Sequence, residues 1–380
     1  MKKVSNLGVF TLLLVSSLTI MVGSVIAPSL SGIVNHLNFG YSPSWLITLP
    51  SLGVVVFAPF IGRLLNKLGT FKLLSFGLIP YAVFGIAGAF ISNDIVLMID
   101  RFLLGAATVA IQVSVTAFIA ELFTGETRMK MIAWQGMAIE LGGVIFLALG
   151  GILGEINWQF PFYIYLVALV CLVFVLKSLP KSGAKNIAAE TISKSKDENK
   201  FRVRVVFGAA LLAMMLFFVC FVTLPLYLPK TYNLSESETG YLMAFISVIA
   251  IITASQMPKV VNYIGDGKTV AMGFLFFMLG YLVLATTVSL SLLILTAIFI
   301  GIGFGFTIPL LNHMTIEVSS LKNQGKNLGF FSMGVFGGQF LSTFIEYISS
   351  DYRAVYGVSA ALGLVISGVV YYLFQKSKPN

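Results

Sequence analysis

Uninterrupted apolar runs recur along the whole chain and constrain its fold more than any other feature. A helix needs about 20 apolar residues to cross the ~30 Å hydrocarbon layer of a membrane. A membrane β-barrel instead shows segments of about ten residues with alternating hydrophobicity, and the run over 211–228 has no such alternation. Only 10% of the 380 residues are charged, against roughly 25% in soluble proteins. The sequence therefore predicts an all-α integral membrane protein.

Polar or charged residues separate the apolar sequence into twelve runs, and we predict each run as a transmembrane helix. They cover residues 7–33, 44–64, 72–92, 95–119, 130–154, 160–179, 203–228, 238–258, 268–288, 290–314, 326–348 and 354–375. Lys and Arg concentrate in the cytoplasmic loops of membrane proteins. With the N-terminus placed in the cytoplasm, only Lys230 and Arg353 fall in loops predicted to lie outside. The charge distribution therefore predicts an even number of spans with both termini in the cytoplasm.

One long hydrophilic connection, residues 180–202, separates six runs from six. It is rich in Lys, Ser, Asn and Glu and lacks hydrophobic periodicity, which is typical of a disordered linker. A basic tether that binds lipid is the alternative. A shift of 196 residues superimposes Arg63, Asn66, Gly69, Lys72 and Gly77 on Lys259, Asn262, Gly265, Lys268 and Gly273. Because such self-similarity is typical of an internal repeat, we predict two pseudo-symmetric six-helix bundles, residues 1–179 and 203–380.

The repeated stretch is predicted as a short basic loop between spans two and three, and again between spans eight and nine. With twelve spans in two halves and a long middle loop, it resembles the plan of the major facilitator superfamily. That resemblance implies a cytoplasmic gate made by Gly62, Arg63, Asn66, Lys67, Gly69 and Lys72 and, in the second half, by Asn262, Gly265 and Lys268. The family usually has an aspartate where Asn66 stands. Asn66 keeps hydrogen bonds but not charge, so we expect a weaker latch. The alternative is that the cations only set orientation.

Span four carries a charged and polar face. Arg101, Gly105, Thr108 and Gln112 follow an i, i+4, i+7, i+11 spacing and therefore share one side of a helix, which should face the bundle or a water-filled cavity. Arg101 and Gly105 also resemble the Arg-x-x-x-Gly pattern of the family. Arg101 lies about 9 Å below the outer boundary, so a side chain that reaches the surface is the alternative. Asp100 points about 100° away and meets Arg101 only if the side chains bend.

Glu140 lies near the middle of span five, beside the small residues Ala133, Gly136 and Gly143. A charged side chain at that depth costs at least ~2.5 kcal/mol, which favours its neutral form. Such a carboxyl can take up and release a proton, so we predict that Glu140 couples transport to protons and that Asp100 and Arg101 tune it. The alternative is a carboxyl that stays protonated and only bonds a neighbouring helix.

The second half has fewer polar residues inside its spans. Asn312 and His313 lie on span ten, and Gln339, Thr343 and Glu346 follow an i, i+4, i+7 spacing on span eleven. Glu317 coincides with Glu121 under the shift of 196 residues, which places both at the cytoplasmic ends of corresponding helices. We predict these side chains as gate or helix-end contacts. His313 could instead sense pH.

The sequence also bears on the energy source and the partners. The nucleotide-binding pattern Gly-x-x-x-x-Gly-Lys-[Ser/Thr] is absent, so an ion gradient is expected to drive transport without a cofactor. The net charge of +9 lies in short loops, so a nucleic-acid partner is not expected. His36 and His313 are predicted on opposite sides of the membrane, which argues against a metal site and against an enzyme.

Span five and the loop after it resemble bacterial drug/proton antiporters. The matching residues are Gly150, Gly151, Trp158, Pro161 and Phe162, although Phe146 and Leu147 replace a usual Gly-Pro. The resemblance implies a monomer in the bacterial plasma membrane that exports amphipathic organic molecules or drugs in exchange for protons by alternating access. Uptake of a small metabolite with protons, and export of a lipid or a metallophore, are the alternatives.

Overall fold

The computed structural model describes residues 5–181, 200–287, 289–319 and 323–377. Most of the predicted linker, residues 182–199, lies outside these ranges. Within them every regular element is a helix, and twelve segments are long and apolar enough to cross a membrane. The predicted all-α class and the number of spans are therefore confirmed for this part of the chain.

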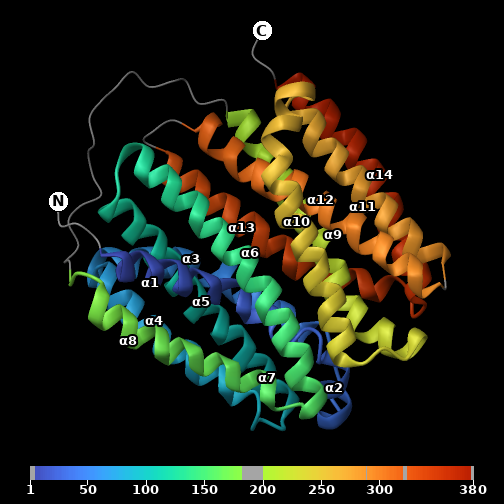
Figure 1. The fold of residues 1–380 in the computed structure, drawn as a ribbon, viewed down its shortest axis with the longest axis horizontal. Coiled ribbons are helices and arrows are strands. Elements are labelled where there is room, and N and C mark those ends of the chain that lie inside the picture. The colour runs from blue at the N-terminus through green and yellow to red at the C-terminus, as the bar shows by residue number, and fades with distance from the viewer. Residues whose placement is uncertain (1–4, 182–199, 288, 320–322, 378–380) are drawn as a thin grey trace. The chain divides into compact units, whose positions relative to one another are not determined.

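The chain divides into two compact units, of which the first contains α1 to α8 and residues 235–241 at the start of α10, and the second contains α9, the rest of α10, and α11 to α14 (Figure 1). The helices before the linker are α1 Asn6–Ser24, α2 Leu30–Leu37, α3 Trp45–Leu68, α4 Thr70–Ala87, α5 Asp94–Leu122, α6 Gly125–Ile156, α7 Phe160–Tyr163, η1 Ile164–Leu166 and α8 Val167–Ser178. Those after it are α9 Lys200–Tyr232, α10 Glu236–Ile264, α11 Asp266–Thr286, α12 Leu290–Val318, α13 Gln324–Ser342, η2 Thr343–Ile348 and α14 Tyr352–Lys376.

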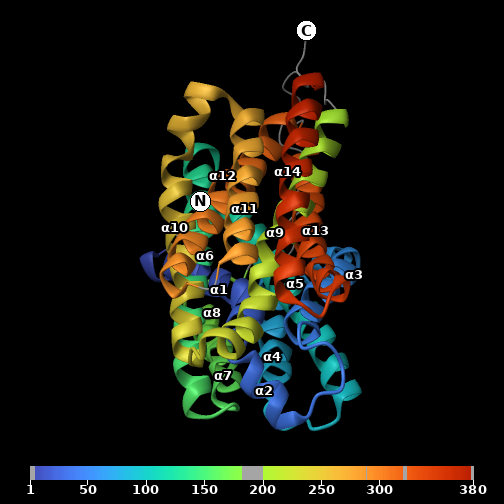
Figure 2. The same ribbon diagram turned by 90° about the vertical axis from the view of Figure 1, so that its right-hand side faces the viewer.

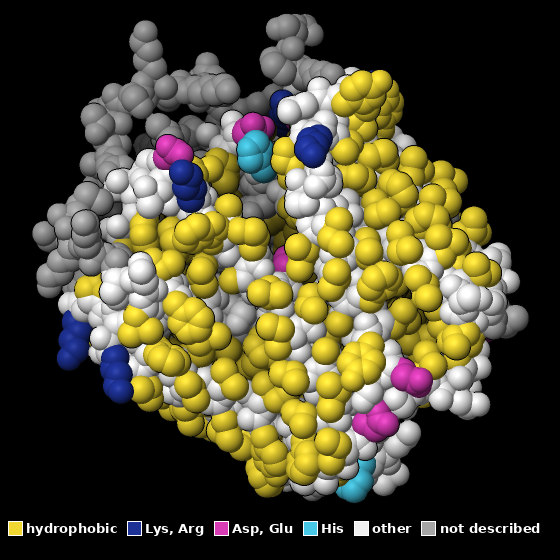
Figure 3. Space-filling model, viewed as in Figure 1, with side chains coloured by type: hydrophobic (Ala, Val, Ile, Leu, Met, Phe, Trp, Pro, Cys, Tyr) yellow, Lys and Arg dark blue, Asp and Glu magenta, His cyan; other side chains and the backbone are white. Residues whose placement is uncertain are grey.

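Each unit packs its own helices around its own core. In the first unit α5 packs against α3 and α4, while α1 packs against α6. In the second unit α11 runs beside α12 and α14, and α9 packs against α12 and α13 (Figures 1 and 2). On the face drawn in Figure 3, hydrophobic side chains cover the middle and most charged ones lie near the edges, as expected for a surface that contacts hydrocarbon.

The first predicted span is not continuous. We predicted one helix over 7–33, but α1 ends at Ser24 and the short helix α2 begins only at Leu30. Pro28 disfavours the helical conformation of the residue before it, so the chain leaves the helix here. The Ser29 hydroxyl donates a hydrogen bond to the Gly150 carbonyl of α6 at 2.9 Å, which fixes the segment after the break.

The predicted basic loop is also corrected. Residues 62–68 belong to the last turns of α3, and only Gly69 separates α3 from α4. Gly69 has φ 77° and ψ 164°, and Gly265, its counterpart between α10 and α11, has φ 88° and ψ 160°. Glycine adopts such positive φ values without a Cβ penalty. One glycine therefore reverses the chain in each half, and no longer loop is needed.

The internal repeat extends to close helix contacts. A Cβ at Gly105 of α5 would lie 2.1 Å from the Pro50 carbonyl oxygen of α3, and a Cβ at Gly301 of α12 would lie 2.6 Å from the Ile246 carbonyl oxygen of α10. Both members of the second pair follow the first by 196 residues. The two helix pairs therefore cross at equivalent points, where only glycine lets the backbones approach so closely.

Gly105→Ala should destabilise the first unit by about 1–3 kcal/mol, because the Pro50 carbonyl is backbone and cannot move aside as a side chain can. The measurement is the thermal unfolding temperature of the purified protein in detergent. Gly208→Ala on α9 is the control, since a Cβ there would meet no atom within 4 Å. Equal unfolding temperatures for the two variants would contradict the expectation.

Candidate functional site

Arg101 and Asp100 form a buried ion pair on α5. Arg101 is 0% exposed and Asp100 is 6% exposed. The Arg101 Nε and Nη2 atoms donate to Asp100 Oδ2 at 3.0 and 2.6 Å. Asp100 and Arg101 are neighbours in sequence, and their side chains meet because the long arginine side chain bends back toward the carboxylate. Helix geometry alone did not predict whether this bending occurs. Arg101 does not reach the outer surface, so that alternative is not found.

Arg101 also holds the end of α4. Its Nη2 atom donates to the carbonyl oxygens of Phe84 and, at 3.3 Å, Gly85. Since α4 ends at Ala87, these carbonyls belong to its last turn. Carbonyls at a helix C-terminus carry partial negative charge and favour a nearby cation. Arg101 therefore connects α4 to α5 through charge-assisted hydrogen bonds.

Aromatic side chains connect this ion pair to the end of the first unit that holds α2. The Arg101 guanidinium lies over the rings of Phe162 and Tyr165, 5.4 and 5.7 Å from their centroids. Trp158 meets Phe162 edge-on at 6.3 Å, and the His36 ring of α2 stacks on Trp158 at 4.6 Å. Trp158 and Phe162, two of the residues that gave the exporter resemblance, thus form a contact chain from His36 to Arg101, which sequence reasoning missed.

The second half lacks this arrangement. Under the shift of 196 residues Thr296 and Ala297 stand at the positions of Asp100 and Arg101. Tyr281 stands at the position of Gly85, where a Cβ would lie 2.2 Å from Tyr165. Gly85 on α4 therefore leaves room for Tyr165 beside Arg101. At the equivalent position of α11 the larger side chain of Tyr281 is present instead. Within the described residues, the second unit therefore has no such ion pair at the equivalent positions.

The rest of the polar face of α5 is packed within the unit. Gly105 lies against α3, and the buried Thr108 hydroxyl donates to the Leu104 carbonyl of its own helix at 2.8 Å. Gln112 is half-buried. Arg101, Gly105 and Thr108 thus face the interior of the first unit, which is one of the two settings that the spacing predicted.

Glu140 lies at the midpoint of α6 and is half-buried. Among the described residues it has no hydrogen-bond or ion-pair partner, and it does not join the ion pair of Asp100 and Arg101. One turn earlier, a Cβ added to Gly136 would meet no atom within 4 Å, so this stretch of α6 borders open space. A carboxyl with this surrounding can bind a proton or a positively charged group.

The residues predicted for the cytoplasmic gate lie at helix ends. Exposed side chains are those of Arg63, Asn66, Lys67, Lys72, Asn262, Lys268 and His313. The Thr70 hydroxyl at the start of α4 donates to Glu121 at the end of α5. At the same two positions of the second half, Asp266 pairs with Arg202 of α9, and Glu317 lies 3.7 Å from His313. Gly62 and Asn312 are half-buried and Gln339 is buried.

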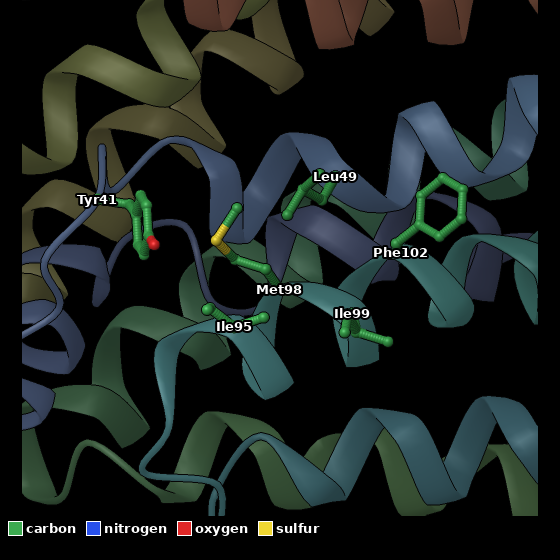
Figure 4. Close-up of a pocket in the computed structure, with 6 residues that line it drawn as sticks. All are labelled: Tyr41, Leu49, Ile95, Met98, Ile99 and Phe102. Atoms are coloured by element: carbon green, nitrogen blue, oxygen red, sulfur yellow. The ribbon is translucent and has the colours of Figure 1, made fainter.

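A cavity of about 270 Å³ lies between α3 and α5 in the first unit (Figure 4). Its lining residues are Tyr41, Leu49, Ile95, Met98, Ile99 and Phe102. No charged side chain lines it, and none of the predicted site residues does. The cavity therefore supplies no proton-binding group.

A family model of the Major Facilitator Superfamily matches residues 12–343 and 206–380. The chain belongs to the Major Facilitator Superfamily. This membership confirms the family resemblance carried by the repeated stretch around Gly69 and by the two six-helix halves.

Characterised relatives of this superfamily member have drug-resistance names. Multidrug resistance protein 2 of Bacillus subtilis (strain 168) is 24% identical over 250 residues, 62% of each chain. Multidrug resistance protein 1 of the same strain is 28% identical over 160 residues, 41% of this chain and 40% of the relative. Quinolone resistance protein NorA of Staphylococcus aureus (strain Mu50 / ATCC 700699) is 22% identical over 337 residues, 87% of this chain and 86% of the relative. The chain spans less than two thirds of the length of the two Bacillus relatives.

Solved structures share the superfamily fold. The nucleoside transporter NupG matches with a TM-score of 0.77 and 14% identity over 97% of this chain and 100% of that one. The peptide transporter POT matches with a TM-score of 0.80 and 13% identity over 97% of this chain and 94% of that one. At these identities the likeness concerns the fold alone.

Proposed function

We propose that this protein is a secondary active transporter, and not an enzyme, that exports amphipathic organic molecules in exchange for protons. The similarity to Multidrug resistance protein 2 and to NorA supports drug export. The observation that carries proton coupling is the carboxyl of Glu140 at the midpoint of α6, with no ionic partner among the described residues. An unpaired carboxyl at such a depth is costly and is typical of proton pathways.

Glu140 supplies the exchange in this mechanism. As a carboxylate it attracts the positive end of an amphipathic molecule, and as a carboxylic acid it does not. Binding of a proton from outside therefore releases the substrate there, and loss of the proton inside restores the site. The two units, each with its own core, move as rigid bodies between the two states. The ion pair of Arg101 and Asp100 keeps the first unit intact during that movement.

Proteoliposomes with an imposed pH gradient test this proposal. A cationic amphipathic dye, a neutral drug, a nucleoside and a dipeptide are offered in turn, and substrate movement and proton flux are recorded together. We expect the dye to move against the direction of the protons. Co-movement of protons with the nucleoside or the dipeptide, and none with the dye, would show uptake by symport and overturn the proposal.

Asn66→Asp should shift the conformational equilibrium of the transporter. Asn66 is exposed in the last turn of α3, four residues before Thr70 in the first turn of α4. A carboxylate there gains a favourable interaction with the N-terminus of α4, typically about 0.3–1 kcal/mol. The measurement is the substrate transport rate together with protease accessibility of the predicted cytoplasmic ends. Asn262→Asp, at the same position of the repeat, is the matched comparison. If Asn66→Asp leaves both quantities unchanged, Asn66 has no latch role.

A further inference from the structure

Two buried tyrosines hold the first helix of the first unit. The Tyr81 hydroxyl, from α4, donates to the Leu18 carbonyl of α1. The Tyr165 hydroxyl, from η1, donates to the Val22 carbonyl at 2.7 Å. Both tyrosines are 0% exposed, and their ring centroids lie 5.7 Å apart. The helix ends at Ser24, two residues after the second of these contacts.

Two tyrosines hold the first helix of the second unit in a similar way. The Tyr281 hydroxyl, from α11, donates to the Leu216 carbonyl of α9 and accepts from the Cys220 N–H at 3.1 Å. The Tyr356 hydroxyl, from α14, lies 3.1 Å from the Thr223 hydroxyl. Both tyrosines are 0% exposed, with centroids 6.1 Å apart.

The sequence repeat does not account for this similarity. Under the shift of 196 residues Tyr81 corresponds to Phe277 and Tyr165 to Ala361. Tyr281 and Tyr356 therefore reach α9 from positions that are not equivalent to those of the first pair. In each unit two buried tyrosines therefore form hydrogen bonds to the first helix, but the tyrosines stand at different positions of the repeat.

Tyr281 acts on the hydrogen-bond ladder of α9. In a regular α-helix the Cys220 N–H donates to the Leu216 carbonyl, and the Tyr281 hydroxyl bonds both groups. Helices bend where a side chain enters the ladder. Two further features weaken the next turn, since the Thr223 hydroxyl donates back to the Val219 carbonyl at 2.7 Å and Pro225 has no N–H.

We propose that Tyr281 is a positioning residue for transport, whose hydroxyl makes a hinge at Leu216 and Cys220 so that residues 221–232 can move against the rest of the second unit. The hinge serves the transport cycle of the proposed function, but its geometry is independent of the substrate.

Tyr281→Phe tests the hinge because it keeps the ring and removes only the hydroxyl. The Cys220 N–H then bonds only the Leu216 carbonyl, so hydrogen exchange of the amides in 216–224, measured by mass spectrometry without substrate, should slow by about fivefold. The maximal transport rate should fall while the apparent KM for substrate stays unchanged. Tyr263→Phe, at a side chain that is 90% exposed on α10, is the control for both measurements.

Faster or unchanged exchange in 216–224 would overturn the proposal, because the hydroxyl would then be only a stabilising bond. A lower unfolding temperature alone does not produce slower exchange, so the exchange measurement separates a hinge from a purely structural role. The exchange result also stands if the wild-type protein moves none of the substrates offered, since no substrate is present in that measurement. Failure of the proposed function and failure of the hinge are thereby distinguished.

Discussion

Glu140→Gln should reduce proton-driven transport to the level of protein-free vesicles while the fold stays intact. Glutamine has the shape of the protonated carboxyl but cannot release a proton, so the transporter is held in one protonation state. Glu140 is half-buried without a hydrogen-bond partner among the described residues, so the amide breaks no existing contact. The measurement is dye export in proteoliposomes under a pH gradient, with proton flux followed in the same vesicles.

Exchange of labelled for unlabelled cationic dye, which needs no net proton movement, should also be strongly reduced in Glu140→Gln, because the amide, like the carboxylic acid, does not attract the positive end of the dye. Glu126→Gln is the matched control on the same helix, because Glu126 is 82% exposed and its pair with Lys130 is a surface contact. Surface pairs of this kind contribute about 0–1 kcal/mol, so this variant should transport as the wild type does. An unaltered pH dependence of transport in Glu140→Gln would remove Glu140 from the mechanism.

The number and placement of the spans could be predicted because burial in lipid is a property of local composition. Residues 211–228 form a hydrophobic run that can be recognised without the rest of the sequence, and α9 contains this run. The repeat was equally accessible, since Gly69 and Gly265 keep their spacing and both have positive φ. Pro28 indicated the break after Ser24. The span was nevertheless predicted from hydrophobic composition, and the apolar residues on both sides of Pro28 favoured one continuous helix.

The surroundings of Arg101 could not be predicted in the same way. Its acceptors on α4 are the carbonyls of Phe84 and Gly85, and a backbone carbonyl has no signature in a sequence. The rings of Phe162 on α7 and Tyr165 on η1 reach it from more than 60 residues later in the chain. The polar face of α5 indicated that Arg101 points into the bundle, but which groups meet it there depends on how α4 and α7 pack.

Arg101→Leu should destabilise the first unit more than any other single change considered for it. The leucine leaves the Asp100 carboxylate, 6% exposed, without the guanidinium that bonds it. Removing one partner of a buried ion pair costs about 3–5 kcal/mol, because the remaining charge is uncompensated. The last turn of α4 loses its cation at the same time. We expect the thermal unfolding temperature in detergent to fall by about 10 °C.

The double variant Asp100→Asn with Arg101→Leu should recover part of that loss, because it removes the stranded charge but not the missing bonds to α4. Arg101→Lys should be intermediate, since one ammonium cannot reach both the carboxylate and the two carbonyls as the planar guanidinium does. Lys130→Ala, which breaks an exposed pair on α6, is the control and should change the unfolding temperature little. If Arg101→Leu unfolds at the temperature of this control, Arg101 does not hold α4 and α5 together.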